Sequence, residues 1–193
     1  MVTQVLILRS SPRKRANSSI LADQVADGAK AAGAAVESYD LASLEIRPCD
    51  GCDFCQDLGN GACQINDDMQ MLYPKLMEAG SIVIASPIYW FTINAQAKLC
   101  IDRWYALQGP GGSALAGKRI GIILTYGDDD AFKSGTMNAI HTYQDMFRYV
   151  GAEIAGIVHA SVSDAGEIER QPEVLRRAYA LGQRLGEEGR DSL

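Results

Sequence analysis

The sequence predicts an α/β fold in which helices are wound onto both faces of a five-stranded parallel sheet, giving three layers. One observation is a set of short, continuous apolar runs at residues 5–8, 81–86 and 120–124, a pattern typical of strands buried on both faces. The other is that such runs alternate with apolar residues at helical spacing, as in residues 20–32. Strand, helix and strand in this order form a βαβ unit, whose right-handed crossover makes the strands parallel.

Cap and breaker residues mark the ends of the elements. Asn17, Ser18 or Ser19 is expected to cap the first helix, because their side-chain oxygens accept hydrogen bonds from the free N–H groups of a first turn. Gly33 is expected to end this helix, and Pro74 predicts a kink or a restart in the second one. The predicted strands are residues 5–8, 36–41, 81–86, 120–124 and 154–158, and the predicted helices are residues 20–32, 69–77, 95–107, 136–149 and one that begins at Pro172.

The composition is that of one ordinary globular domain. A chain of 193 residues with 47% hydrophobic residues is long enough for a single sizeable core, so residues 1–193 are expected to form one domain. The formal charge of −6 argues against binding to nucleic acid or to anionic membranes. No apolar run has the length of a membrane span and the first residues lack the pattern of a signal peptide, so we expect a cytoplasmic protein.

The segment between the first strand and the first helix is rich in cations and hydroxyls. Residues 9–19 contain four cations and no apolar residue larger than alanine. Hydroxyls in a basic loop before a helix N-terminus form a site for phosphate. Neither Gly-rich nucleotide signature is present, and hydroxyl groups suit a monophosphate such as that of FMN. The alternative is an ordinary βα connection with a capped helix.

Four of the five cysteines lie within fifteen residues, in the pattern C-x2-C-x2-C-x7-C. In a reducing compartment, this clustering points to metal or redox use and not to disulfides. Three thiols at x2 spacing suit the corners of a cubane cluster better than one tetrahedral zinc, and the flexible Gly59-Asn60-Gly61 would bring the last thiol back as fourth ligand. Thiols without a cluster, and zinc, are the alternatives. The candidate ligands are Cys49, Cys52, Cys55 and Cys63.

Three consecutive aromatic residues follow the third predicted strand, in the stretch Pro87-Ile88-Tyr89-Trp90-Phe91. Ligands of open α/β sheets bind outside the carboxyl ends of the strands. The three rings cannot all face the core at this edge, and a displayed wall of this kind suits a flat ring system. The alternative is a hydrophobic patch that dimerisation buries.

These motifs together resemble the NAD(P)H-dependent FMN reductase family. Ser10-Ser11-Pro12-Arg13-Lys14 with Asn17-Ser18 is similar to its S-P-R-x(n)-N-[ST] phosphate loop, although the family commonly has glycine where this chain has Arg9 or Ser10. The stretch S-P-I-Y-W…A-Q-x-K…D-R is similar to its S-P-x-Y segment and the helix that follows. The cysteine motif, with Asp67-Asp68-Met69 after it, resembles the iron–sulfur flavoprotein branch of the family, which carries a [4Fe–4S] cluster beside FMN. The resemblance implies a flavodoxin-like strand order of 2-1-3-4-5.

The resemblance also implies a function, that of an FMN-dependent oxidoreductase whose chemistry occurs on the flavin, so that no side chain is expected to be catalytic. Its implied partners are a small-molecule electron donor or acceptor, NAD(P)H, or a ferredoxin, and the chain is expected to be a homodimer or homotetramer. The alternatives are a cluster-free NAD(P)H-dependent FMN, quinone or azo reductase, and a redox carrier or sensor without enzymatic activity. The residues implied to contact FMN are Ser10, Arg13, Asn17, Ser18, Ser19, Pro87, Ile88, Tyr89, Trp90, Phe91, Thr125, Tyr126 and Gly127.

The remaining polar residues of interest are assigned structural roles. Lys98, Asp102 and Arg103 share a helix face and are expected to form an ion pair, and Cys100 on the same helix is expected to be buried. The acidic run at residues 128–130 is expected to form a turn that caps the next helix. Asp67 or Asp68 is expected to cap the second predicted helix, and His141 and His159 are expected to be structural.

Overall fold

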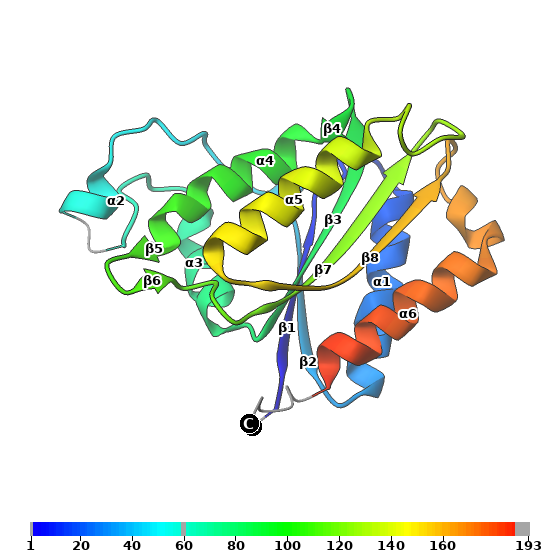
Figure 1. The fold of residues 1–193 in the computed structure, drawn as a ribbon, viewed down its shortest axis with the longest axis horizontal. Coiled ribbons are helices and arrows are strands. Elements are labelled where there is room, and N and C mark those ends of the chain that lie inside the picture. Colours follow the sequence, from blue (N-terminus) through cyan, green and yellow to red (C-terminus); the bar gives the residue numbers. More distant parts are fainter. Residues whose placement is uncertain (1, 59–60, 188–193) are drawn as a thin grey trace.

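A parallel sheet forms the centre of the molecule (Figure 1). The computed structural model describes residues 2–58 and 61–187. The five main strands pair in the order β2-β1-β3-β7-β8, all parallel, which confirms the predicted order 2-1-3-4-5. Their bounds are β1 Gln4–Arg9, β2 Ala35–Asp40, β3 Ser81–Tyr89, β7 Arg119–Tyr126 and β8 Glu153–Ser161.

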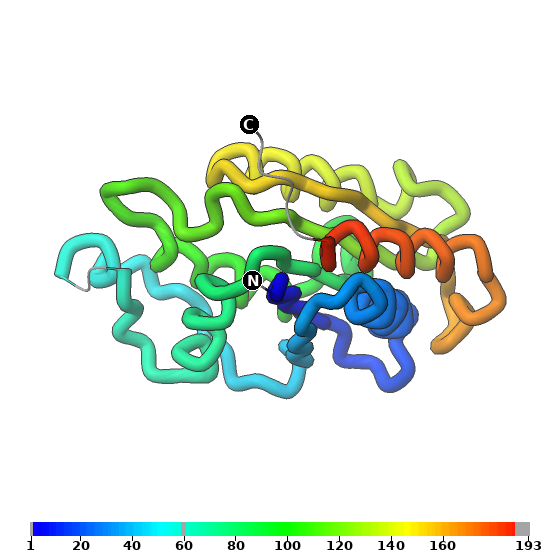
Figure 2. The backbone as a smooth tube through the Cα atoms, turned by 90° about the horizontal axis from the view of Figure 1, so that it is seen from below, coloured from blue at the N-terminus to red at the C-terminus, as the bar shows by residue number. Residues whose placement is uncertain are grey.

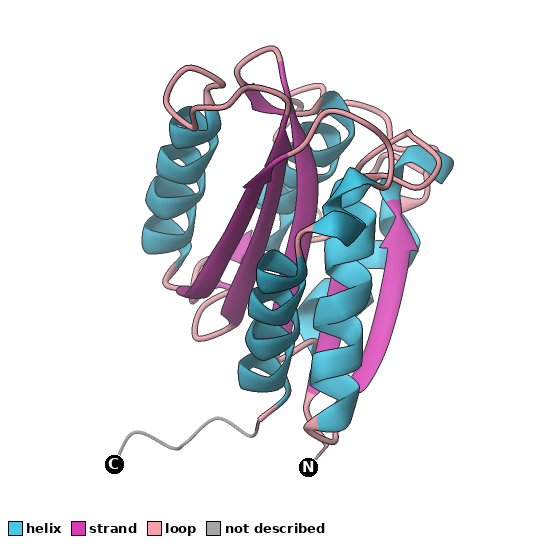
Figure 3. Ribbon diagram, turned by 90° about the vertical axis from the view of Figure 1, so that its right-hand side faces the viewer, coloured by secondary structure: helices cyan, strands magenta, loops and turns pink. Residues whose placement is uncertain are grey.

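Helices cover both faces of the sheet and complete the three layers (Figure 3). α1 and α6 lie side by side on one face, and α3, α4 and α5 cover the other (Figure 2). Helix bounds are α1 Asn17–Ala31, α2 Phe54–Asp57, α3 Met69–Glu78, α4 Ala95–Asp102, α5 Thr136–Val150 and α6 Pro172–Gly186, and the short elements are η1 Leu41–Ser43, β4 Thr92–Ile93, η2 Arg103–Leu107, β5 Gln108–Gly109, β6 Gly112–Ser113 and η3 Glu167–Arg170.

The side chains of each central strand divide between two hydrophobic cores. Val5 and Ile7 of β1 pack with α1 and α6, whereas Leu6 and Leu8 pack with the helices of the opposite face. All four are at most 2% exposed. Successive side chains of a strand point to opposite faces of the sheet, and helices cover both faces. The strands therefore consist of continuous apolar runs.

Helices α1 and α6 approach closely because glycines form their contact. A Cβ atom added to Gly28 would lie 2.0 Å from the carbonyl oxygen of Tyr179, and one added to Gly182 would lie 2.0 Å from that of Val25. Each helix therefore packs its glycine against the backbone of the other. This contact holds α1 and α6 together on one face of the sheet.

Four of the main strands, β1, β3, β7 and β8, extend farther than predicted. β3 runs on through Pro87 to Tyr89 and turns back into β4 as a hairpin, and β7 includes Thr125 and Tyr126. The predicted helix at 95–107 is instead α4 followed by the 3₁₀ helix η2. Residues 108–113 form the two-stranded β5–β6 ribbon.

The predicted cap of α1 is wrong. Ala16 occupies the N-cap position and no side chain caps the helix. Asn17 lies in the first turn of α1, but its side-chain amide binds residues that follow β8. Its Nδ2 donates to the carbonyl of Asp164, and its Oδ1 accepts from the N–H of Ile168. Gly33 follows the C-cap with a φ of +89°, a left-handed conformation that glycine adopts readily.

Cap predictions for the other helices are partly corrected. α3 runs without a restart across Pro74, although proline leaves one carbonyl of the preceding turn without its helical bond. Asp68 occupies its N-cap position, but its carboxylate accepts from the N–H of Glu45. Gly135, not the acidic run at 128–130, precedes α5. Gly59 and Asn60, expected to give the cysteine segment flexibility, lie outside the described residues.

Among residues 2–58 and 61–187, we find no helix with the length and apolar character that a bilayer span requires.

Replacing Gly182 with alanine should destabilise the fold by about 1–3 kcal/mol, because the new methyl group meets a backbone carbonyl that cannot rotate away. Chemical denaturation of the variant measures this free energy of unfolding. Gly111→Ala is the control, since a Cβ atom there has no neighbour within 4 Å. Equal effects of the two substitutions would contradict the close approach of α1 and α6.

Candidate functional site

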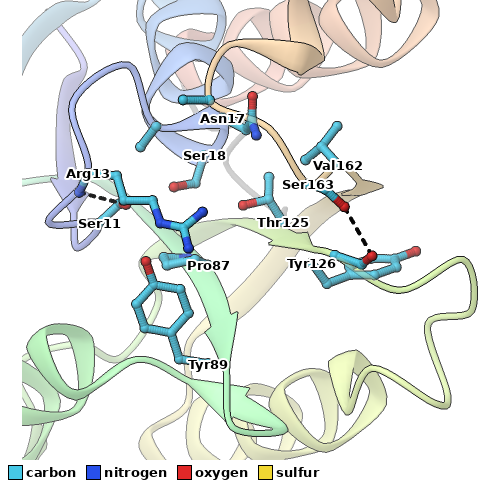
Figure 4. Close-up of a pocket in the computed structure, with 13 residues that line it drawn as sticks. Ser11, Arg13, Asn17, Ser18, Pro87, Tyr89, Thr125, Tyr126, Val162 and Ser163 are labelled. Carbon is cyan, nitrogen blue, oxygen red and sulfur yellow. Dashed lines mark hydrogen bonds between the residues drawn. The ribbon is translucent and has the colours of Figure 1, made fainter.

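A cavity of about 200 Å³ lies at the carboxyl edge of the sheet, where the loops after β1, β3, β7 and β8 meet (Figure 4). The first three loops are those expected from the sequence, and parallel pairing brings them together. The loop after β8 was not predicted to contribute, although it follows a strand that ends at the same edge. The cavity is lined by Ser11, Arg13, Ala16, Asn17, Ser18, Pro87, Tyr89, Thr125, Tyr126, Gly127, Val162, Ser163 and Ala165.

The first turn of α1 forms one end of this cavity. Ile20 makes the first intrahelical bond, to the carbonyl of Ala16, so the N–H groups before it are outside the helical ladder. Ser18 is 1% exposed, and its Oγ has no hydrogen-bond partner among the described residues. A buried hydroxyl without a partner costs free energy, and it lies beside the positive end of a fifteen-residue helix. This combination suits an anion.

Arg13 extends its side chain into the cavity, where it lies between Ser18 and Tyr89 in the view of Figure 4. Its guanidinium stands 5.7 Å from the centre of the Tyr89 ring, in cation–π geometry. Its own N–H donates to Oγ of Ser11 at 3.3 Å, which shapes the loop. The cavity thus has one charged wall and one aromatic wall.

The ends of β7 and β8 form the opposite side. Thr125 is 6% exposed and presents its side chain to the cavity. The Tyr126 hydroxyl lies 3.3 Å from Nδ1 of His159, and burial lowers the pKa of this histidine. Ser163 donates from Oγ to the carbonyl of Gly127 at 3.2 Å. His159 therefore supports a residue of the cavity wall from behind.

Some of the residues predicted to bind a ligand lie outside the cavity lining. Ser10 is fully buried, and Ser19 lines a neighbouring basic hollow. Ile88 is half-buried and packs against the hydrophobic core. Trp90 and Phe91 lie on the exposed turn between β3 and β4. The predicted residues that do line the cavity are Arg13, Asn17, Ser18, Pro87, Tyr89, Thr125, Tyr126 and Gly127.

Ser10 instead belongs to a buried polar network that fixes the first loop. Its Oγ donates to the carbonyl of Ala85 at 3.0 Å, and its own carbonyl accepts from Nδ2 of Asn94 at 2.7 Å. The same Asn94 caps α4 by accepting from the N–H of Ala97. One side chain thus joins the loop after β1 to the start of α4.

The turn between β3 and β4 holds two aromatic residues in a strained conformation. Trp90 and Phe91 have φ angles of +50° and +68°, which are unfavourable for residues with a side chain. The backbone of Phe91 is held against Gly135, where a Cβ atom would lie 2.4 Å away, and its carbonyl accepts from Asn138. Trp90 and Phe91 are 91% and 55% exposed as whole residues. The strained turn therefore displays both rings beside the cavity.

The cysteine segment, residues 48–66, projects from the body of the molecule with α2 at its tip (Figure 1). Cys49 and Cys52 are exposed, and Cys55 and Cys63 are half-buried. Four thiols on one short segment are the donor set that iron–sulfur clusters use. The described residues contain no group of three or more histidine, cysteine or acidic side chains gathered as metal ligands. The donor chemistry of the four thiols fits a cluster.

A buried ion pair lies at the base of the cysteine segment. Arg103 and Asp67 have side chains that are 1% and 0% exposed, and Arg103 also donates to Sγ of Cys63 at 3.3 Å. Burial alone would raise the pKa of Asp67, but hydrogen bonds from Arg103 and from two backbone N–H groups outweigh it and lower that pKa. Lys98 and Asp102 form the expected pair on the helix surface, so the prediction that Arg103 joins them is wrong. Cys100 is buried as predicted.

Comparison with known proteins supports the family predicted from the motifs. A family model described as a flavodoxin-like fold, Flavodoxin_2, matches residues 3–185. The chain belongs to the Flavodoxin_2 family. Among its relatives, an iron–sulfur flavoprotein of Archaeoglobus fulgidus is 31% identical over 180 residues, which are 92% of this chain and 76% of that protein.

Other similar proteins are named for quinone reduction. The FMN-dependent NADH:quinone oxidoreductase of Shewanella baltica is 29% identical over 181 residues, 86% of this chain and 90% of that protein. The solved structure of the NAD(P)H:quinone oxidoreductase from Methanothermobacter marburgensis has a TM-score of 0.76 at 17% identity, and covers 98% of this chain and 100% of that chain. At this identity, the structural match shows the flavodoxin-like fold alone.

Asp67→Asn should reduce the free energy of unfolding by about 3 kcal/mol at neutral pH, because it leaves Arg103 buried without a counter-charge. The folded-state pKa of Asp67 lies below its unfolded value, so its stabilisation is complete above the unfolded pKa and is lost as pH falls through the folded one. The difference in the free energy of unfolding between wild type and Asp67→Asn should therefore become smaller in acid. Denaturation at several pH values measures it.

The matched control is Asp102→Asn, which removes an exposed ion pair on the neighbouring helix and should cost less than about 1 kcal/mol. If the difference in the free energy of unfolding between wild type and Asp67→Asn stays constant as the pH falls, the lowered pKa of Asp67 is contradicted.

Proposed function

We propose that the protein is an FMN-dependent oxidoreductase that binds FMN at the carboxyl edge of the sheet. The single observation that carries this is the buried Ser18 hydroxyl, which has no hydrogen-bond partner among the described residues and lies at the start of α1. A phosphate there would accept from this hydroxyl and from the first N–H groups of the helix. The family membership and the names of the relatives support the same cofactor.

Each wall of the cavity has a role in this proposal. Arg13 balances the charge of the phosphate, and Asn17 holds the loop after β8 through its two hydrogen bonds. Tyr89 and Pro87 offer a flat apolar surface to the flavin ring, while Thr125 and Gly127 offer polar atoms to its edge. The enclosed volume of about 200 Å³ is below the range usual for sites that hold a whole large ligand. The ring therefore extends to the open rim, beside Trp90.

The redox chemistry, when FMN is bound, is that of the isoalloxazine ring, which accepts and gives up a hydride or electrons. The protein contributes binding and orientation. NAD(P)H is the donor and a quinone-like small molecule the acceptor that the relatives' names support. Substrate would approach from the open rim, where Trp90 and Phe91 are exposed. Burial of the same two rings between copies of the chain would give the homodimer or homotetramer expected from the sequence.

A second candidate function adds a [4Fe–4S] cluster that passes single electrons to or from the flavin. It is favoured by the four cysteines of one segment and by the relatives named iron–sulfur flavoproteins. Cys49, Cys52, Cys55 and Cys63 would hold the cluster. This candidate implies reducing surroundings, such as the cytoplasm, and a one-electron partner such as ferredoxin. The cluster-free reductase remains its alternative.

Ser18→Ala should weaken FMN binding by about 2 kcal/mol, or roughly 30-fold in Kd, because it removes a hydrogen bond to a charged phosphate. Fluorescence titration of the apoprotein measures the Kd. Riboflavin, which lacks the phosphate, should bind both forms equally. Ser19→Ala is the control, as Ser19 neighbours Ser18 in sequence but lies outside the cavity. Absence of FMN binding by the wild type would refute the proposal.

Protein purified without oxygen should contain about four iron and four sulfide per chain if the second candidate is correct. Elemental analysis and the visible spectrum of one sample measure this. Cys63→Ser should lower the iron content while FMN binding stays unchanged, and Cys100→Ser serves as a comparison at a cysteine outside the segment. Bound FMN without iron in the wild type would leave the cluster-free reductase.

A further inference from the structure

The two ends of the cysteine segment meet at one buried side chain, Arg103. At the first end, Arg103 donates from Nη1 to the carbonyl of Arg47 at 2.9 Å. The backbone N–H of Arg47 donates to the carboxylate of Asp67, also at 2.9 Å. At the second end, Arg103 donates from Nη2 to Sγ of Cys63 at 3.3 Å. The ion pair therefore holds the backbone just before the segment and the last thiol within it.

Further contacts fix the second end. Gln70 donates to the carbonyls of Cys63 and Ile65, both at 2.8 Å. The hydroxyl of Tyr73 donates to the carbonyl of Arg103 at 3.1 Å. By contrast, Cys49 and Cys52 are exposed. One thiol of the four is anchored to the core, and at least two are on the surface.

A gain in folding stability does not explain why the Arg103–Asp67 ion pair is buried. Apolar residues of similar volume often stabilise a core equally well, and Arg103 leaves its Nε without a partner among the described residues. What the pair provides is direction: a guanidinium has N–H groups at fixed angles, and Arg103 aims one at a sulfur while others hold Arg47 and Asp67. Hydrogen bonds of this kind orient metal ligands and adjust the potential of a cluster.

We propose that Arg103 and Asp67 are a positioning pair that closes the cysteine segment into a loop and presents Cys63 as the pre-set ligand of a metal centre. This rests on the second candidate function. Because both ends of the loop are already held together, less chain entropy is lost when the remaining thiols gather. The N–H group directed at Cys63 stabilises negative charge on its sulfur, so it raises the reduction potential of a cluster bound there.

The test compares two variants with wild type after identical anaerobic reconstitution with iron and sulfide. The double variant Arg103→Met/Asp67→Leu removes the pair without leaving a buried charge unpaired. Arg103→Lys keeps a positive charge beside Asp67 but lacks the planar fork that reaches both Arg47 and Cys63. The double variant Lys98→Met/Asp102→Leu removes the exposed pair of α4 and is the matched control.

Two measurements separate positioning from a purely structural role. In a titration with a ferrous chelator, the Arg103 variants should lose cluster iron at about ten-fold lower chelator concentration, which is the usual effect of removing a group that orients a ligand. In a redox titration followed by visible absorption, their cluster should have a more negative potential. The control should match wild type in both, and all forms should bind FMN with the same Kd, which shows that the fold is retained.

The outcomes distinguish this proposal from those on which it rests. A wild-type cluster with unchanged chelator sensitivity and potential in both Arg103 variants would mean that the pair only stabilises the fold. Should the double variant fail to bind FMN, Arg103→Lys decides by the same two measurements. A wild type that binds FMN but assembles no cluster would overturn both this proposal and the second candidate, and leave the FMN proposal intact.

Discussion

Parallel pairing of β1 with β3, and of β3 with β7, places three strand ends at one edge of the sheet. The residues that line the cavity are far apart in sequence, and this pairing is what brings them together. Each strand is buried on both faces, so a shift in register would move apolar side chains out of both cores. The geometry of the cavity thus depends on hydrophobic packing that lies outside it.

The candidate site has features that hydrophobic packing alone does not explain. Ser18 is buried without a partner among the described residues, and Trp90 and Phe91 have left-handed backbones and exposed rings. These features cost free energy in the unliganded chain. They occur at the same sheet edge, around one cavity, which is typical of a surface that is completed by a ligand.

Much of this arrangement could be predicted because strands and phosphate loops have local signatures. Apolar runs and alternation predicted all five main strands, and the Ser-Pro-Arg loop was predicted at the sheet edge where it lines the cavity. Ser10 and Ser18 could not be told apart from the sequence, since both are serines of one short polar segment. Only the fold turns Ser10 toward Ala85 and leaves Ser18, in the first turn of α1, facing the cavity. The partnership of Arg103 with Asp67 was also missed. The two residues are 36 positions apart, whereas the helical pattern suggested partners within one turn of Arg103.

Helix α4 connects the two regions that carry the proposed functions. Asn94 at its start holds the loop after β1, and Arg103 at its end holds Cys63. Nine residue steps at a rise of 1.5 Å make their backbone positions roughly 14 Å apart. The length of this one short helix therefore helps to set the separation between the loop that lines the cavity and the anchored thiol. In a protein that carried electrons between these regions, the distance of transfer would be a fixed property of the fold, independent of how the exposed part of the cysteine segment moves.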